Sequence, residues 1–314
     1  PTKVSLSQES EKNIKRSHRY LFQNLDADKS IYGVNTGFGN LSHIQIDSSD
    51  IDKLQVNLIR SHASGVGSPL HPGIVRAILF LKLLTFAKGY SGVSIDLVKK
   101  IIQFLNKDLL PVIPEKGSVG ASGDLAPLGH MALALIGEGE VFFKGNREKT
   151  LTALKKARVK PLSLKPKEGI SLINGTQVST AIAIKALLDG HRLLISADIA
   201  GALSVENSFS SHKVFQKKIH DLKKHPGQKI SARNIYKLLS KSEIVRSHSN
   251  CGKVQDPYSF RCIPHVHGAS RDIFSNAANI INNEINSVSD NPLILDSKTI
   301  VSSGHFHAEH VAMA

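Results

Sequence analysis

The segment from Thr176 to Glu206 decides the fold, and it reads TQVSTAIAIKALLDGHRLLISADIAGALSVE. It is long, rich in alanine, and places apolar residues on several faces of an α-helix. A helix of this kind is normally buried on most sides, within a bundle of helices or within an oligomer. We therefore expect a mainly α protein built around a long helix.

Helical patterns of ordinary length lie on both sides of this segment. Ser48–Arg60 repeats apolar residues at the period of an amphipathic helix. Further helices are expected from Pro72 to about Gly89, at Ile95–Asn106 after an N-cap at Ser94, at Leu125–Ile136 and at Ala269–Val288. Strand candidates are few and short: Glu140–Lys144 and a hairpin-like pair around Asp296-Ser297. We find no internal repeat and no alternation of strands with helices, so the predicted class stays mainly α.

The charge balance is basic. The 314 residues include 40 Lys plus Arg and 26 Asp plus Glu, which gives a formal net charge of +14. Such an excess raises nucleic acid, a membrane surface or an anionic substrate as partners. Its densest stretch, from Lys217 to Lys241, does not interleave aromatic residues as a stacking platform for bases would. The pattern favours a solvated basic surface, and no nucleic-acid partner is expected.

The sequence predicts a soluble protein of the cytoplasm. Cys251 and Cys262 form neither a CxxC pair nor a zinc spacing, which favours two reduced thiols. The polar N-terminal stretch from Lys3 to Arg19 is not a signal peptide. The most apolar stretches, Ile74–Ala87 and Val178–Leu203, contain charged residues that argue against a membrane span: Arg76, Lys82, Lys185, Asp189 and Arg192.

The segment Gly117–Leu128, GSVGASGDLAPL, carries the most chemical information. Its glycines predict a tight turn that leads into a helix, with Asp124 near the helix start. On spacing alone it is either a plain loop or a weak anion site at a helix N-terminus. It lacks the Lys-Ser/Thr ending of a P-loop.

The same segment resembles the signature of the aromatic amino acid lyases. In that family an Ala-Ser-Gly triplet cyclises into 4-methylidene-imidazol-5-one (MIO), an electrophile, and the resemblance assigns this role to Ala121, Ser122 and Gly123. The residue types suit the chemistry, because glycine leaves its nitrogen unobstructed and serine can become a dehydroalanine. A turn that presses the two backbone groups together stores local strain. No metal and no dissociable cofactor are expected.

Four further segments resemble the family in the same order along the chain. They are Tyr32–Gly39 (YGVNTGFG), Asn174–Gln177 (NGTQ), Gln255–Cys262 (QDPYSFRC) and Phe306–Glu309 (FHAE). Taken alone, Tyr32 would be a structural tyrosine in a turn and Asn174 a helix N-cap. The resemblance instead implies that Tyr32 removes a β-proton from the substrate, and that Asn174 bonds near the ring and the substrate amine.

The remaining site residues also come from the resemblance. Gln255 and Tyr258 line the site, with Tyr258 counted among the catalytic residues, and Phe306 lies near the ring. Arg261 binds the substrate carboxylate, for which a planar guanidinium is suited because it grips a carboxylate at two points.

Ser61-His62 points to the substrate. In the family the pair at this position correlates with the ring accepted: Phe-Leu for phenylalanine, His-Leu for tyrosine and Ser-His for histidine. An imidazole that donates or accepts a hydrogen bond suits an imidazole substrate. Without the family, His62 is as readily a helix-end histidine satisfied by the backbone.

The resemblance therefore implies a lyase of the histidine branch, which converts L-histidine to trans-urocanate and ammonia in histidine degradation. The implied fold is a long-helix bundle of the fumarase/aspartase-like type. Residues 1–170 would form an N-terminal domain that bears the ring, and residues 171–314 the first part of the bundle. The implied assembly is a homotetramer in which three subunits share each active site. The chain begins at Pro1 and ends at Ala314 inside an apolar run, so we expect a longer protein whose C-terminal part supplies a glutamate near the substrate.

Departures from the family pattern occur at His265, His305 and His310, where glutamine, asparagine and often proline are common. They leave the named site residues intact. Three alternatives stay open: another MIO enzyme, such as a phenylalanine or tyrosine lyase or an aminomutase; a metal-dependent hydrolase; and a basic nucleic-acid-binding protein. The hydrolase would use His305, His307, Glu309 and His310, or His265 and His267, because these residue types bind zinc.

Overall fold

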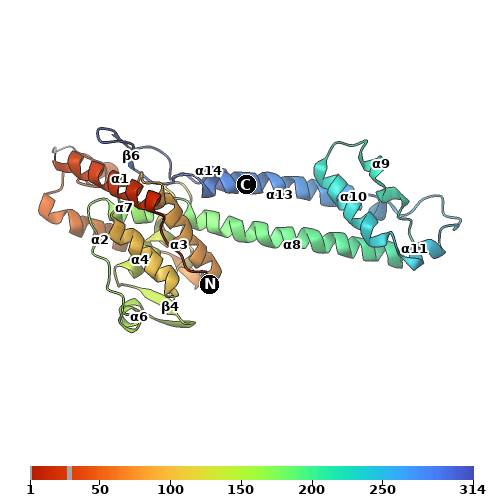
Figure 1. The fold of residues 1–314 in the computed structure, drawn as a ribbon, viewed down its shortest axis with the longest axis horizontal. Helices are drawn as coiled ribbons and strands as arrows, with labels where there is room; N and C mark the ends of the chain where they lie inside the picture. The colour runs from red at the N-terminus through yellow and green to blue at the C-terminus, as the bar shows by residue number, and fades with distance from the viewer. Residues whose placement is uncertain (1, 27–29) are drawn as a thin grey trace. The chain divides into compact units, whose positions relative to one another are not determined.

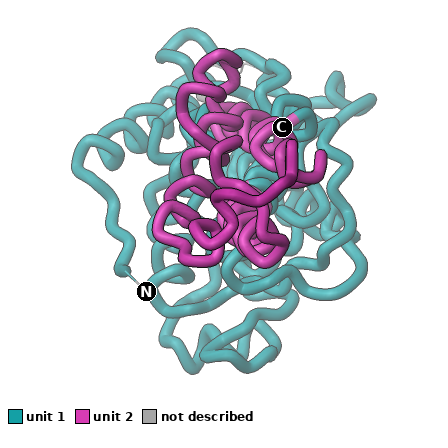
Figure 2. The backbone as a smooth tube through the Cα atoms, turned by 90° about the vertical axis from the view of Figure 1, so that its right-hand side faces the viewer, with its two compact units in different colours: residues 1–183, 281–313 teal, residues 184–280, 314 magenta. Residues whose placement is uncertain are grey.

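The computed structural model describes residues 2–26 and 30–314, and this part of the chain is mainly helical (Figure 1). It divides into two compact units (Figure 2). Unit 1 comprises Pro1–Ala183 and Ile281–Met313, and unit 2 comprises Ile184–Ile280 with Ala314. The domain boundary predicted at residues 170 and 171 from the family resemblance stays a prediction.

Unit 1 is built mainly from helices packed around an aliphatic core. Its whole helices are α1 (Gln8–Asp26), α2 (Ile51–His62), α3 (Pro72–Ala87), α4 (Ile95–Asn106), α5 (Leu125–Leu135), α6 (Thr150–Ala157), α7 (Glu168–Ile173) and α14 (Glu309–Met313), with short 3₁₀ turns at Gly39–Leu41 and Ser48–Asp50. The start of α8 (Gln177–Asn207) and the end of α13 (Ile263–Ile285) also belong to it. Helix α4 illustrates how local sequence forms these helices. Ser94 caps its N-terminus by accepting a hydrogen bond from Leu97 N, and one apolar face buries Ile101 and Phe104 in the core.

Three small antiparallel sheets flank these helices. β1 (Val66–Pro69) pairs with β3 (Pro114–Lys116), and β6 (Leu293–Ile294) pairs with β7 (Ile300–Val301). The third sheet has the order β2-β4-β5, from Leu109–Pro111, Glu140–Phe143 and Asn146–Lys149. The strand predicted at Glu140–Lys144 is present as β4, and the hairpin-like pair predicted around Asp296-Ser297 is present as β6 and β7. The partner strand β5, which follows the turn at Lys144-Gly145, was not predicted.

Unit 2 contains a pair of long helices with shorter ones attached. α8 and α13 run antiparallel, since Leu194 and Asp198 of α8 bond Arg271 and Asp198 also bonds His267 of α13 (Figure 1). The shorter elements are the 3₁₀ turn Lys213–Phe215, α9 (Lys217–His220), α10 (Pro226–Leu239), α11 (Glu243–Ser247) and α12 (Tyr258–Arg261). Burial alone would raise the pKa of Asp198, but hydrogen bonds from Ser231, Asn234 and His267, together with Arg271, lower it. This carboxylate therefore joins α8, α10 and α13 as an ionised group.

The prediction of a mainly α protein is confirmed, and two observed helices differ from those predicted. The helix predicted from Ala269 begins at Ile263, because Pro264 lies in its first turn, where a missing N–H costs nothing. Helix α1, on the polar N-terminal stretch, was not predicted from the sequence. In the described ranges, no helix has the length and apolar character needed to cross a membrane.

Candidate active site

A cavity of about 730 Å³ in unit 1 gathers five of the predicted site residues. They come from separate segments of the chain: Tyr32, His62, Ser122, Asn174 and Phe306. The first follows α1, the second ends α2, and the third precedes α5. The last two lie in the short link between α7 and α8 and just before α14. The fold thus brings together residues that the sequence separates by up to 274 positions.

The Ala121–Gly123 loop is tightly bent. Gly123 has a left-handed φ of +79°, and a Cβ added to it would lie 2.5 Å from the carbonyl oxygen of Gly175. No side chain fits there, because real Cβ atoms do not come so close to backbone atoms. Ser122 is exposed to the cavity, while Ala121 lines a neighbouring hollow of about 690 Å³. The loop therefore fits a triplet that needs a bare glycine nitrogen and an accessible serine.

Asp124 fixes the loop from its C-terminal side. Its carboxylate accepts hydrogen bonds from Val178 N and Ser179 N at 2.8 Å, Ser179 Oγ at 2.6 Å and Ser118 Oγ at 2.5 Å. Its own N–H donates to Gly175 O at 2.8 Å. These amides belong to the first turn of α8, where N–H groups lack helical partners. Asp124 therefore links both ends of the loop to the start of the long helix.

His62 is held by the backbone of its own helix. Its Nδ1 lies 2.9 Å from the carbonyl oxygen of Leu58 and 3.1 Å from Ser61 Oγ. A carbonyl only accepts, so Nδ1 carries the hydrogen and Nε2 keeps a lone pair in the neutral ring. Ser61 is exposed and lies outside the cavity lining; its Oγ donates to the same Leu58 carbonyl at 2.9 Å.

Gly129 of α5 permits the close approach of α2 at this point. A Cβ on Gly129 would lie 3.0 Å from Ala63 N and 3.1 Å from the carbonyl carbon of His62. A larger residue would push the end of α2, and with it His62, away from α5.

Tyr32 lies in the turn that follows α1. Its Oη accepts a hydrogen bond from Gly39 N at 3.3 Å, and its ring meets Phe38 edge to face, with centroids 6.3 Å apart. Gln55 of α2 fixes this turn, because its Nε2 donates to Gly33 O at 3.1 Å while its Oε1 accepts from Ile170 N at 3.2 Å. The orientation of Tyr32 is therefore set by packing and by backbone groups.

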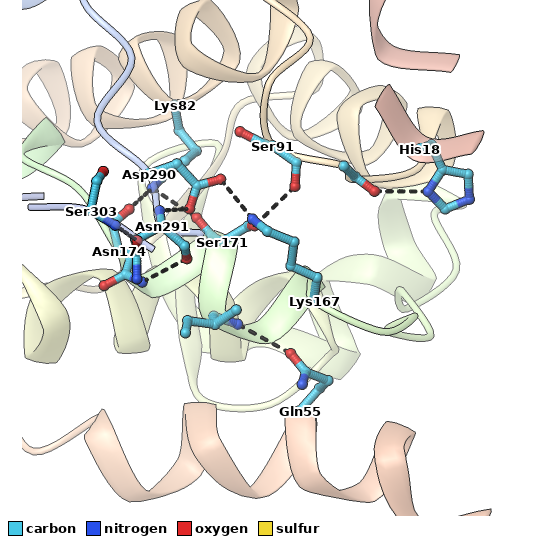
Figure 3. A network of polar contacts seen from close by, with 12 residues as sticks. His18, Gln55, Lys82, Ser91, Lys167, Ser171, Asn174, Asp290, Asn291 and Ser303 are labelled. Carbon is cyan, nitrogen blue, oxygen red and sulfur yellow. Dashed lines mark hydrogen bonds and ion pairs between the residues drawn. The ribbon is translucent and has the colours of Figure 1, made fainter. Parts of the chain in front are cut away.

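Asn174 belongs to a buried polar network (Figure 3). Its Nδ2 donates to Asn291 O at 3.1 Å, and Asn291 Oδ1 accepts from Ser303 N at 2.6 Å. Asn291 and Ser303 themselves line the cavity. The sequence assigned Asn291 no role in the site, so this contribution was missed.

Two buried lysines complete the network (Figure 3). Lys167 Nζ lies 3.1 Å from Asp290 Oδ2 and 2.7 Å from Ser171 Oγ, and neither member of the ion pair is exposed. Lys82 Nζ donates to Ser171 O at 3.1 Å and to Asn174 O at 2.5 Å. Burial lowers the pKa of Lys82 to about 7, against the opposing attraction of Asp290 and Asp124. The sequence showed Lys82 only as a charge within an apolar helix, and that anomaly was the available signal.

The other predicted residues belong to unit 2. A separate pocket of about 410 Å³ is lined by Gln255 and Arg261, among others. Arg261 Nε donates to Asp256 O at 2.9 Å, and Asp256 Oδ2 accepts from Ser211 N at 2.8 Å. Tyr258 is 75% exposed. Gln255, Tyr258 and Arg261 therefore do not line the cavity of unit 1, and their predicted roles stay predictions.

The histidines considered for a metal make other contacts. His305 Nδ1 lies 2.7 Å from Ser303 Oγ, His307 Nδ1 accepts from Glu309 N, and His267 bonds Asp198. Within residues 2–26 and 30–314, no group of three His, Cys, Asp or Glu residues is placed to hold a metal ion. The metal-dependent hydrolase thus lacks a site in this part of the chain.

Comparison with known proteins identifies a family whose sequence profile this chain matches. The sequence profile described as aromatic amino acid lyase matches residues 1–314. The chain is 46% identical over 312 residues to a histidine ammonia-lyase of Myxococcus xanthus (strain DK1622), covering 99% of this chain and 61% of that protein. It is 49% identical over 288 residues to a histidine ammonia-lyase of Stigmatella aurantiaca, covering 91% and 56%. It thus spans about three-fifths of the length of these relatives.

The fold is also similar to that of solved structures. The crystal structure of a tyrosine aminomutase from Streptomyces globisporus matches with a TM-score of 0.92 at 34% identity, over 99% of this chain and 62% of that one.

Proposed function

The chain belongs to the aromatic amino acid lyase family, and on this basis we propose that the whole protein is a histidine ammonia-lyase. The observation that carries the proposal is the cavity of unit 1, because it gathers Tyr32, His62, Ser122, Asn174 and Phe306 around one space. The substrate would be L-histidine, and the products trans-urocanate and ammonia.

The bent loop supports a ring made from Ala121, Ser122 and Gly123. Gly123 N bonds to the carbonyl carbon of Ala121, and the oxygen of that carbonyl leaves as water with the amide hydrogens of Ser122 and Gly123. A second water takes the Ser122 hydroxyl and its Cα hydrogen. Once formed, MIO supplies an electrophilic methylidene carbon that no encoded side chain offers. Asn174 and Phe306, on the same cavity, are the residues that would hold it.

Tyr32 would take the β-proton of the substrate at Oη. The electron pair of the broken C–H bond becomes the new double bond, while the C–N bond breaks and its electron pair leaves with the amine nitrogen. The N–H of Gly39 donates to Oη and helps to fix the position of the oxygen that would take the proton.

His62 would read the substrate ring. Because its Nδ1 hydrogen bonds the carbonyl of Leu58, its Nε2 lone pair can accept the N–H of an imidazole. Phenylalanine offers no such donor, so a site built to bond an N–H disfavours it. This supports histidine over phenylalanine. Tyrosine also offers a donor, its phenol O–H, so the preference for histidine over tyrosine rests on the Ser61-His62 pair and on the names of the relatives.

We further propose that Gln255, Tyr258 and Arg261 reach the substrate from another copy of the chain, in a homotetramer. Large apolar side chains of unit 2 are exposed on α8 and α13, among them Leu188, Leu193, Leu203, Val266 and Ile273. Such surfaces are typical of helices that other helices cover. Arg261, already held at Nε, would present its two terminal nitrogens to the carboxylate.

The test is Ser122→Ala in the whole protein, measured by intact mass and by release of urocanate and ammonia. We expect the wild type to be two waters lighter than its sequence and the variant to lose neither water. Activity should fall on the order of a thousandfold or more, as when an enzyme loses its reactive group, with the fold retained. Ser240→Ala, on the surface of unit 2, is the matched control. Normal turnover of histidine by Ser122→Ala would refute the proposal, and L-phenylalanine and L-tyrosine test the alternative substrates.

A further inference from the structure

Lys82 is a fully buried lysine on α3, a helix whose other buried side chains are mainly apolar. Its Nζ donates to Ser171 O at 3.1 Å and to Asn174 O at 2.5 Å. Both carbonyls lie at the C-terminal end of α7, where a helix leaves carbonyl groups without intrahelical partners. A cation near a helix C-terminus also interacts favourably with the helix dipole. Lys82 therefore closes the end of α7 from a different helix.

The bond to Asn174 O reaches the Ala121–Gly123 loop through a single residue, Gly175. The carbonyl of Asn174 is part of the Asn174–Gly175 peptide, and Gly175 O in turn accepts from Asp124 N at 2.8 Å. Gly175 is also the backbone against which Gly123 lies, at a distance that excludes a Cβ. Lys82 thus holds one end of a short backbone segment whose other end presses on the loop.

The charges that face Lys82 come from several elements. Asp290 and Asp124 attract it, and Lys167, which precedes α7, repels it. Asp290 is itself paired with Lys167 and precedes Asn291, whose carbonyl oxygen receives the side chain of Asn174. An amine that loses its proton keeps two N–H hydrogens, one for each carbonyl. Its hold on α7 therefore does not depend on its charge.

We propose that Lys82 is a positioning residue for closure of the Ala121–Ser122–Gly123 ring. It fixes the Asn174–Gly175 peptide as a rigid support, so that the loop stays bent and Gly123 N stays close to the Ala121 carbonyl carbon. The bonds that form and the two waters that leave are those given above, and Lys82 exchanges no atom with the loop. The inference rests on the proposed function, because it concerns the formation of the same ring.

The experiment compares Lys82→Met with Glu168→Met in the whole protein. Glu168 is equally buried and bonds the other end of the same helix region, where its carboxylate accepts from Ser94 N and Lys165 N. Both variants should lower the temperature of unfolding. Newly made chains are then sampled over time by intact mass, a readout that does not require activity.

We expect the lighter, two-water-depleted mass to appear about tenfold or more slowly in Lys82→Met, because lost geometry alone costs an intramolecular reaction that much. Glu168→Met should close the ring at the wild-type rate. Equal rates in Lys82→Met and the wild type would overturn the inference, as would equal slowing in both variants. If the wild type loses no water, the proposed function itself fails. Should Lys82→Met not fold, Lys82→Gln replaces it, and an unchanged rate in that folded variant overturns the inference.

Discussion

Unit 1 and unit 2 hold their shares of the predicted site in different ways. In unit 1, Asn174 is buried, and its side chain and carbonyl are bonded by groups from other segments. In unit 2, Gln255 and Tyr258 are exposed, and Arg261 is held at Nε by the backbone of Asp256. The difference teaches that the half proposed to form the ring is preorganised by the core of this chain. The half proposed to bind the substrate presents its side chains outward, which suits a partner surface.

Asp124→Ala tests the claim that unit 1 is preorganised, because Asp124 anchors the Ala121–Gly123 loop to the start of α8. It removes an acceptor of four hydrogen bonds and leaves unpaired the buried amide of Val178 and the part-buried amide of Ser179. Buried unpaired groups cost about 1–3 kcal/mol each, so a loss of roughly 3 kcal/mol in unfolding free energy is expected. The ring should not form, and activity should fall about a thousandfold. Urea unfolding and intact mass measure the two effects.

The control for Asp124→Ala is Asp198→Ala in unit 2. Asp198 is also buried and also joins several helices, through Ser231, Asn234, His267 and Arg271. It should cost similar stability while the two-water mass loss persists. A ring that forms normally in Asp124→Ala would show that the loop does not need this anchor.

Arg261→Met tests the opposite half. The fold and the two-water mass loss should be unchanged, because among the described residues the side chain of Arg261 bonds only the backbone of Asp256. A charge-assisted hydrogen bond is worth about 1.5–3 kcal/mol, so kcat/KM for histidine should fall about 10- to 100-fold, mainly through KM. Steady-state kinetics and intact mass provide the measurement. Loss of ring formation in this variant would show that the ring depends on Arg261, and would contradict the separation of the two roles.

Lys82 gives unit 1 a dependence of stability on pH. Its folded pKa of about 7 lies below the ordinary value of about 10.4, so the unfolded chain binds more protons between these limits. The burial penalty is therefore complete below pH 7 and is relieved as the pH rises. Relative to Lys82→Met, the wild type should gain up to about 1.4 kcal/mol per pH unit between pH 7.5 and 9 in urea unfolding. Lys229→Met, at a half-exposed lysine of unit 2, is the control, and a difference that is flat or falls with pH would contradict the expectation.

The sequence predicted the class and many limits because those depend on local patterns. The N-cap at Ser94 and the strand that begins at Glu140 follow from neighbouring residues. The motif that contains Ser122 could likewise be recognised from twelve adjacent letters.

Long-range polar contacts could not be predicted in the same way. Lys82 and Asn174 are 92 positions apart, and Lys167 and Asp290 are 123 apart. Nothing local to either member specifies its partner, because a buried charge is satisfied by whatever the fold brings near. A lysine inside an apolar helix therefore signals that a partner exists without saying which one.

Ser61→Ala has the smallest expected effect, and it tests a feature that both parts of the predicted site have in common. In both, the residue assigned to the substrate is held by a backbone carbonyl, Leu58 O for His62 and Asp256 O for Arg261. Removing the Ser61 hydroxyl leaves the bond between His62 and Leu58 in place. KM for histidine should therefore change by no more than about threefold, or roughly 0.6 kcal/mol, whereas His62→Leu should remove the preference for histidine. A panel of histidine, tyrosine and phenylalanine measures both variants. If Ser61→Ala lost as much selectivity as His62→Leu, the side-chain pair rather than the backbone would orient the imidazole.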